Sequence, residues 1–275
     1  MLVLTNDDGI DAPGIRVLYE VATSLDLPPS LLTDRADRPA SNLKSPDANY
    51  AEGIKTPEVV LVAPDRQYSG CGHQVTTYHP IGIERRSDTE FAISGTPADC
   101  VRVAYGHLAK SADGSGSIPI KLVLSGINAG GNLGIDNYIS GTVAAVREAT
   151  MLGIPAIALS HYRHKGREFD WPGAANLTRR VLDQLLQKDF EPGTFWNVNL
   201  PHPMPGSPEP ELVYCNSDNR PLPIEFKVNF DQHDQHDRIT EYVTNVGVYE
   251  NRDRTPACDI DVCFSGNVAI TKIRL

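Results

Sequence analysis

The sequence predicts an α/β fold in which helices cover both faces of a mostly parallel sheet. Short, continuous apolar runs alternate with segments of helical periodicity along the first two thirds of the chain. Strands that are buried on both faces form continuous apolar runs, whereas half-exposed strands alternate apolar and polar residues. The length of 275 residues fits one large α/β domain with a subsidiary lobe.

Individual elements follow from the same patterns. Strands are expected at residues 1–5, 58–63, 121–125, 154–160 and 195–200. One helix is expected to begin at Pro13, a residue that favours the first helical position, and others at 142–152 and 174–188. We divide the chain into a core at 1–201, with a surface insertion at 26–57, and a β-rich extension at 202–275. In that extension, 241–249 and 268–273 favour strands, and 231–237 is expected to be a polar loop.

Composition excludes several classes of function. The chain has 25 basic and 35 acidic residues, a net charge of −10, so broad electrostatic binding of a nucleic-acid polymer is not expected. No apolar run reaches the roughly 20 residues that span a bilayer, and the N-terminus lacks the basic start of a signal peptide. The five cysteines show no CxxC spacing and fit reduced thiols. We therefore expect a cytoplasmic protein without a membrane partner.

Asp7 and Asp8 directly follow the first predicted strand. Two adjacent carboxylates repel each other and are costly to bury, unless a divalent cation compensates their charge. Hard oxygen donors favour magnesium, manganese or calcium. The alternative is an Asp-rich turn that leads into the helix beginning at Pro13.

The loop after the second strand combines glycines with polar side chains. Ser69 could serve as a neutral metal ligand, Gly70 lies where backbone amides can cradle phosphate oxygens, and His73 could donate a proton or contact phosphate. The alternative is an ordinary surface loop with a structural histidine.

The loop after the third strand is rich in Gly and Asn. Asn128 and Asn132 offer amide oxygens to a metal or NH₂ groups to a phosphate, and Ser140 and Thr142 stand where they can cap the following helix. This segment has neither the dinucleotide glycine pattern nor a P-loop, so a tight connection without a ligand remains the alternative. All three loops follow strands of one sheet, so they should converge on one edge.

Several blocks occur in the order found in the SurE family, which this chain resembles from residue 1 to about 201. They are TNDDG at 5–9, APDR at 63–66 with Ser69-Gly70, SGTPADCV at 94–101, SGINAG at 125–130 with NLG at 132–134, YISGTV at 138–143, GIPAIA at 153–158 and NVNLP at 197–201.

This resemblance implies a Rossmann-like three-layer core and a C-terminal extension exchanged between the subunits of a homodimer or homotetramer. It implies a metal-dependent 5′-nucleotidase that releases phosphate from nucleoside monophosphates, with some activity on other phosphate esters. One divalent cation per subunit, Mg²⁺ or Mn²⁺, is expected on Asp7, Asp8, Ser69 and Asn128. The chain departs from the family in its long 26–57 segment. It also differs in the residues around Asp259, and this second difference concerns C-terminal contacts, assembly and substrate preference rather than the metal site.

Asp7 and Asp8 are the expected catalytic residues, and the sequence leaves open which one accepts a proton from water. A covalent aspartyl-phosphate on Asp7 is a rival route. Contacts to phosphate or substrate are expected from Asn6, Gly70, His73, Asn132, Ser140, Gly141 and Thr142. The rival functions are a nucleotide-binding regulatory protein without turnover and an esterase using Ser69, although Ser69 lacks the Gly-x-Ser-x-Gly elbow.

Overall fold

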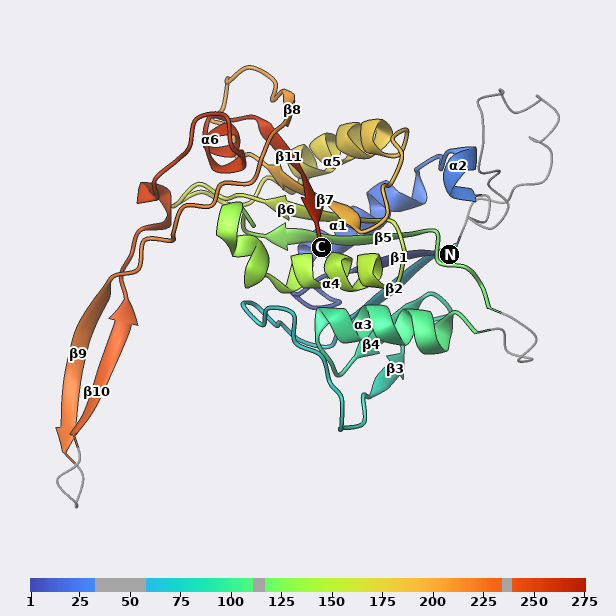
Figure 1. The fold of residues 1–275 in the computed structure, drawn as a ribbon, viewed down its shortest axis with the longest axis horizontal. Coiled ribbons are helices and arrows are strands. Elements are labelled where there is room, and N and C mark those ends of the chain that lie inside the picture. Colours follow the sequence, from blue (N-terminus) through green and yellow to red (C-terminus); the bar gives the residue numbers. More distant parts are fainter. Residues whose placement is uncertain (33–57, 111–116, 234–238) are drawn as a thin grey trace.

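A computed structural model describes residues 1–32, 58–110, 117–233 and 239–275. These residues form a nine-stranded sheet with helices on both faces, which confirms the α/β prediction (Figure 1). In sheet order, the strands are β3 (Ile83–Arg85), β4 (Glu90–Ile93), β2 (Val59–Pro64), β1 (Leu2–Thr5), β5 (Leu122–Ala129), β6 (Ala156–His161), β7 (Thr194–Leu200), β11 (Val268–Arg274) and β8 (Leu212–Tyr214).

The central strands are parallel, as their continuous apolar runs predict. In sheet order, the strands from β4 to β7 pair in parallel with their neighbours. β3 pairs antiparallel with β4, and β11 pairs antiparallel with β7. The five strands expected from the sequence are β1, β2, β5, β6 and β7, each within a few residues of its predicted bounds. β1 therefore lies between β2 and β5, the two strands whose loops carry the other motifs.

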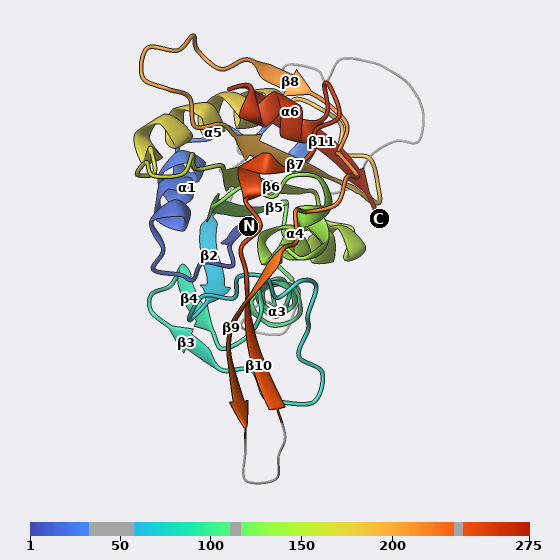
Figure 2. The same cartoon turned by 90° about the vertical axis from the view of Figure 1, so that its left-hand side faces the viewer.

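Alternation along β1 divides the core into two layers. Leu2 and Leu4 pack with apolar residues of α1 (Pro13–Thr23) and α5 (Trp171–Leu185). Val3 packs with α3 (Pro97–Val103) and α4 (Gly141–Met151) on the opposite face. Successive side chains of a strand point to opposite faces, so one apolar strand serves both layers. Figure 2 shows the two helix pairs on either side of the sheet.

β3, β4 and α3 are absent from the sequence prediction. The strands are only three and four residues long, and the three side chains of β3 are exposed. α3 has a recognisable start, because Thr96 and Asp99 form a capping box around Pro97. That box was available in the sequence as a helix signal.

The C-terminal segment both completes the sheet and projects from it. β11 adds antiparallel to β7, and β8 adds parallel to β11, while α6 (Asp259–Phe264) packs nearby. β9 (Phe226–His233) and β10 (Ile239–Asn245) form a two-stranded hairpin that extends away from the body (Figure 1). The predicted loop at 231–237 is wrong for its first three residues, which belong to β9; 234–238 lie outside the described residues.

Most of the predicted surface insertion at 26–57 lies outside the described residues. Its described beginning includes the short helix α2 (Pro29–Leu32), and Leu27 and Leu31 are buried in the core beside α1. In the part of the chain that the structure describes, no helix is long and apolar enough to cross a membrane.

Candidate active site

The predicted metal-ligand residues line a single cavity. Asp7, Asp8, Ser69 and Asn128 come from the loops or ends of β1, β2 and β5, and together they border a cavity of about 300 Å³. Because these three strands are neighbours and parallel, their carboxyl ends lie at one edge of the sheet. Gly70, Asn132 and Ser140 also line this cavity.

Asp7 is almost completely buried, with 4% of its surface exposed. The pKa of its carboxyl group is raised to about 6, mainly by burial and in smaller part by the charge of neighbouring Asp8, while hydrogen bonds from Thr142 act in the opposite direction. The Thr142 hydroxyl donates to Asp7 Oδ1 at 2.5 Å. The Thr142 hydroxyl thus holds the Asp7 carboxyl group in one orientation.

Asp8 connects the loops of two strands. The backbone N–H of Ala129 donates to Asp8 Oδ2 at 2.8 Å. Burial raises the pKa of the Asp8 carboxyl group, against the effect of this hydrogen bond and one from the Gln67 side chain. Across residues 1–32, 58–110, 117–233 and 239–275, no ion pair reaches Asp7 or Asp8.

Ser69 and Asn128 present neutral oxygens beside the two carboxylates. Gln67 Nε2 donates to Ser69 Oγ at 2.8 Å. Asn128 Nδ2 donates to the Gly130 carbonyl at 2.8 Å, which leaves Asn128 Oδ1 as an acceptor. The pairing of β5 with β6 shifts register between Ser125 and Asn128, an irregularity of the kind that redirects side chains near active sites.

The first turn of α4 packs directly against Asp7. Ser140 caps the helix, its Oγ accepting from the Val143 N–H at 3.1 Å. A Cβ at Gly141 would lie 2.7 Å from Asp7 Cβ, so glycine permits this close approach. Thr142 is fully buried and donates to Asp7. Of these three expected substrate contacts, only Ser140 lines the cavity; the other two support Asp7.

Asn6 and His73 do not line the cavity. Asn6 is buried and closes the turn that carries the two aspartates, with Nδ2 donating to the Gly9 carbonyl and Oδ1 accepting from the Gly9 N–H. His73 Nε2 lies 2.8 Å from Glu148 Oε2, and Glu148 also accepts from Arg102. Their predicted substrate contacts remain predictions, and the structure gives each a structural partner instead.

Asn132 lines the cavity but its amide nitrogen is engaged. Asn132 Nδ2 donates to Ser160 Oγ at 2.8 Å, and the Asn132 carbonyl accepts from the side chains of Asn197 and Asn199. This buried network ties the loop after β5 to β6 and β7. The amide oxygen of Asn132 is its remaining acceptor.

One wall of the cavity comes from the C-terminal segment, and the sequence did not predict it. Tyr249, in the short 3₁₀ helix η5 (Tyr249–Asn251), lines the cavity together with Asp136. The Tyr249 hydroxyl donates to Asp136 Oδ2 at 2.6 Å, and Arg252 Nη1 lies 2.8 Å from the same oxygen. The Arg252 side chain is fully buried. Tyr249 is more than a hundred residues from the other site motifs, and no local pattern links it to them.

The donors fit a hard divalent cation. Two carboxylates, a hydroxyl and an amide carbonyl give an all-oxygen set, which suits Mg²⁺ or Mn²⁺ and not a metal that prefers sulfur. Within the described ranges, His, Cys, Asp and Glu side chains form no group of three or more that could hold a metal. A cation at this cavity therefore depends on Ser69 and Asn128 as well as on the aspartates.

Comparisons with known proteins agree with this architecture. The family described as Survival protein SurE matches residues 40–220. The chain belongs to the SurE family. A Nostoc protein that carries a 5′-nucleotidase name is 46% identical over 274 residues, covering 100% of this chain and 99% of its own. The 5′-nucleotidase SurE of Paramagnetospirillum magneticum is 32% identical over 273 residues, covering 99% and 88%.

The SurE crystal structure from Aquifex aeolicus superposes with a TM-score of 0.71 at 26% identity, covering 99% of this chain and 92% of that one. The sequence resemblance to the SurE family ends near residue 201 and the family match ends at residue 220, whereas the two relatives and the Aquifex structure each cover at least 99% of this chain. The segment that supplies Tyr249 and Arg252 is therefore part of the shared architecture.

We predict that replacing Arg252 with methionine destabilises the protein by about 3–5 kcal/mol, because Asp136 would be left as an unpaired buried charge. Arg220→Met is the matched control: Arg220 is a partly exposed arginine 3.6 Å from Asp253, and this substitution should cost less than about 1 kcal/mol. Urea unfolding of both variants measures the difference. Equal losses would show that the Arg252–Asp136 pair does not hold this wall of the site.

Proposed function

We propose that this chain is a metal-dependent 5′-nucleotidase that hydrolyses nucleoside 5′-monophosphates to nucleoside and phosphate, with activity on other phosphate monoesters. The observation that carries the proposal is the pair of adjacent aspartates, Asp7 buried and Asp8 partly buried, that border one cavity with Ser69 and Asn128 and have no described cationic partner. A protein that only held phosphate would gain little from two carboxylates, since these repel an anion. The names of the full-length relatives support the same reaction.

Asp7, Asp8, Ser69 and Asn128 would hold the cation, with Mg²⁺ or Mn²⁺ favoured by the oxygen donors. When bound, such a cation neutralises charge on the phosphate and lowers the pKa of a water molecule. The protein's own part is to fix the donors: Thr142 orients Asp7, and the Ala129 N–H orients Asp8. Rigid placement of this kind avoids reorganisation during the reaction.

The carboxylates of Asp7 and Asp8 are the groups that can accept the proton of an attacking water. Asp7 is buried and its Oδ1 already accepts from Thr142, which favours attack by water over formation of an aspartyl-phosphate. Gly70 and Ser140 flank the same cavity, and the Ser140 hydroxyl can donate to a phosphate oxygen because its Oγ accepts from Val143. These contacts would hold the phosphate in line with the water.

We predict that phosphate release from a panel of nucleoside 5′-monophosphates requires Mg²⁺ or Mn²⁺ and stops in EDTA. Asp8→Asn should lower kcat by roughly a hundredfold or more, because it removes one charge from the cation's ligands. Asp189→Asn, an exposed aspartate outside the site, should leave kcat unchanged. Colorimetric phosphate release measures all three proteins.

Release that persists in EDTA would contradict the proposed metal dependence and favour a serine esterase-like route. No release from folded protein with any cation would contradict hydrolysis altogether and favour a nucleotide-binding protein. Full activity of the Asp8→Asn variant in saturating Mn²⁺ would show that Asp8 is neither a required metal ligand nor a catalytic group.

We also propose that the chain forms a homodimer or homotetramer in which the C-terminal hairpin of one subunit packs on another. The β9–β10 hairpin projects from the body (Figure 1) and carries exposed apolar residues, including Phe226 at 61%, Val228 at 53% and Val243 at 50% exposure. An isolated two-stranded hairpin is marginally stable in water, and an exposed apolar patch marks a contact surface.

A reducing, cytoplasmic location fits the five free cysteines.

We predict that sedimentation equilibrium gives at least twice the chain mass, and that Phe226→Ser combined with Val243→Ser shifts the protein toward the monomer. The reason is that these substitutions remove apolar area from the hairpin surface. Tyr105→Ser, at a similarly exposed position in another part of the molecule, is the control. A monomeric wild-type protein at micromolar concentration would contradict the assembly.

A further inference from the structure

A second cavity lies beside the catalytic cavity. This neighbour has a volume of about 370 Å³ and shares Ala129, Gly131 and Tyr249 with the cavity that holds the aspartates. A ligand with its phosphate bound in the first cavity would have to pass these shared residues to reach the second cavity. The volume suits a ring system of nucleoside size.

Aromatic side chains form the walls of this second cavity. Tyr162, Phe169 and Tyr249 line it. Phe169 stacks with Trp171, their ring centroids 5.1 Å apart and their planes 21° from parallel, and Tyr162 packs against Phe264 at 4.8 Å. Planar bases bind by stacking on such rings, so this cavity has the chemistry of a base subsite.

Tyr249 is fixed in place by the buried network described above. Its hydroxyl donates to Asp136, whose carboxylate is held by the fully buried Arg252. The ring therefore presents a rigid surface at the junction of the two cavities. A rigid aromatic wall lowers the entropy cost of binding a planar group.

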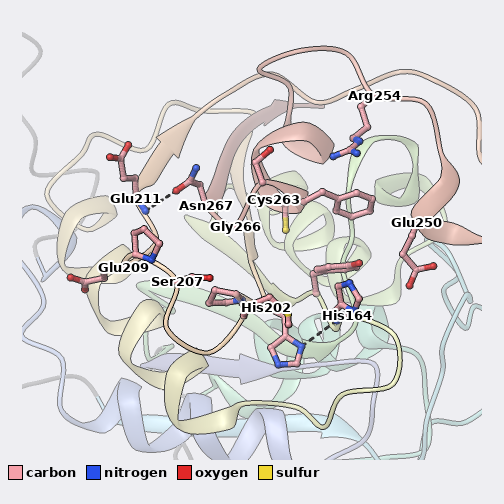
Figure 3. A pocket seen from close by; sticks show the side chains of 16 residues that line it. His164, His202, Ser207, Glu209, Glu211, Glu250, Arg254, Cys263, Gly266 and Asn267 are labelled. Atoms are coloured by element: carbon pink, nitrogen blue, oxygen red, sulfur yellow. Dashed lines mark hydrogen bonds between the residues drawn. The ribbon is translucent and has the colours of Figure 1, made fainter.

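Two charged side chains border the same cavity, and neither forms an ion pair with another described residue. The Arg163 guanidinium lies over the Phe169 ring, 5.0 Å from its centroid, and Glu250 follows Tyr249 directly. Glu250 also borders a larger cavity of about 640 Å³ on its other side. Figure 3 shows Glu250 on the rim of that larger cavity, with its carboxylate apart from the Arg254 guanidinium on the same segment.

We propose that the second cavity binds the base of the nucleotide and selects guanine, with Glu250 as the selecting residue. This inference rests on the proposed 5′-nucleotidase function. The Glu250 carboxylate accepts from N1–H and the exocyclic NH₂ of guanine, and Arg163 donates to the O6 acceptor. Hypoxanthine offers only the N1–H donor at that edge. Adenine places the N1 acceptor there instead, which the carboxylate repels.

The test compares kcat/KM for GMP, IMP, AMP and ribose 5-phosphate, which has no base. The wild-type order should be GMP, then IMP, then AMP. Glu250→Gln should lower kcat/KM for GMP by about 10- to 100-fold, the effect of losing charge-assisted hydrogen bonds, while ribose 5-phosphate changes little. Glu211→Gln, which borders only the larger cavity, should leave every ratio unchanged.

Phe169→Ala should lower kcat/KM for all nucleotides by about tenfold, because it removes an aromatic wall of the cavity and the ring that supports Arg163, again without affecting ribose 5-phosphate. A GMP-to-AMP ratio that Glu250→Gln does not change would overturn the proposal, as would equal losses for GMP and ribose 5-phosphate. If the wild-type protein hydrolyses none of the substrates, the proposed function fails instead. Calorimetry with guanosine and adenosine then tests the subsite alone: tighter binding of guanosine that Glu250→Gln removes supports it, and equal binding overturns it.

Discussion

The site depends on one constraint: two adjacent carboxylates, Asp7 buried and Asp8 partly buried, lie at the end of β1 without a cationic side chain among the described residues to pair with them. Burial raises the pKa of Asp7 from 3.8 to about 6, so the ionised group costs about 3 kcal/mol near neutral pH. The surrounding structure holds this charge in place: Gly141 lets α4 approach Asp7, Thr142 donates to it, and Ala129 donates to Asp8. An arrangement of this kind is stable and useful when a divalent cation shares the cavity.

The sequence could predict this centre because parallel strands bring their carboxyl ends together. The apolar runs of β1, β2 and β5 identified the strands, and the polar residues after each run identified the loops. What the pattern could not show is which polar group faces the cavity. Asn6 and Thr142 have the right residue types, but their hydrogen bonds go to Gly9 and Asp7. Such choices depend on side-chain partners, which spacing alone does not specify.

The C-terminal third was the hardest part to predict, because its role depends on contacts between residues far apart in the chain. β11 returns to pair with β7 at the sheet, and the segment before it places Tyr249 against Asp136 beside the aspartates. The buried Arg252–Asp136 pair fixes that contact. The site is thus built from both ends of the chain. This explains how a segment that resembles an appendage in the sequence can form one wall of the cavity.

The most direct test of this account is the melting temperature of metal-free protein at pH 8, with and without Mn²⁺. The raised pKa of Asp7 means that its stabilising contribution is present below pH 3.8 and is lost as the pH rises through about 6. Mn²⁺ should therefore raise the melting temperature of the wild-type protein. Asp7→Asn should raise the metal-free value and remove the response to Mn²⁺. A wild-type protein that does not respond to Mn²⁺, or an Asp7→Asn variant that melts lower without metal, would contradict the account.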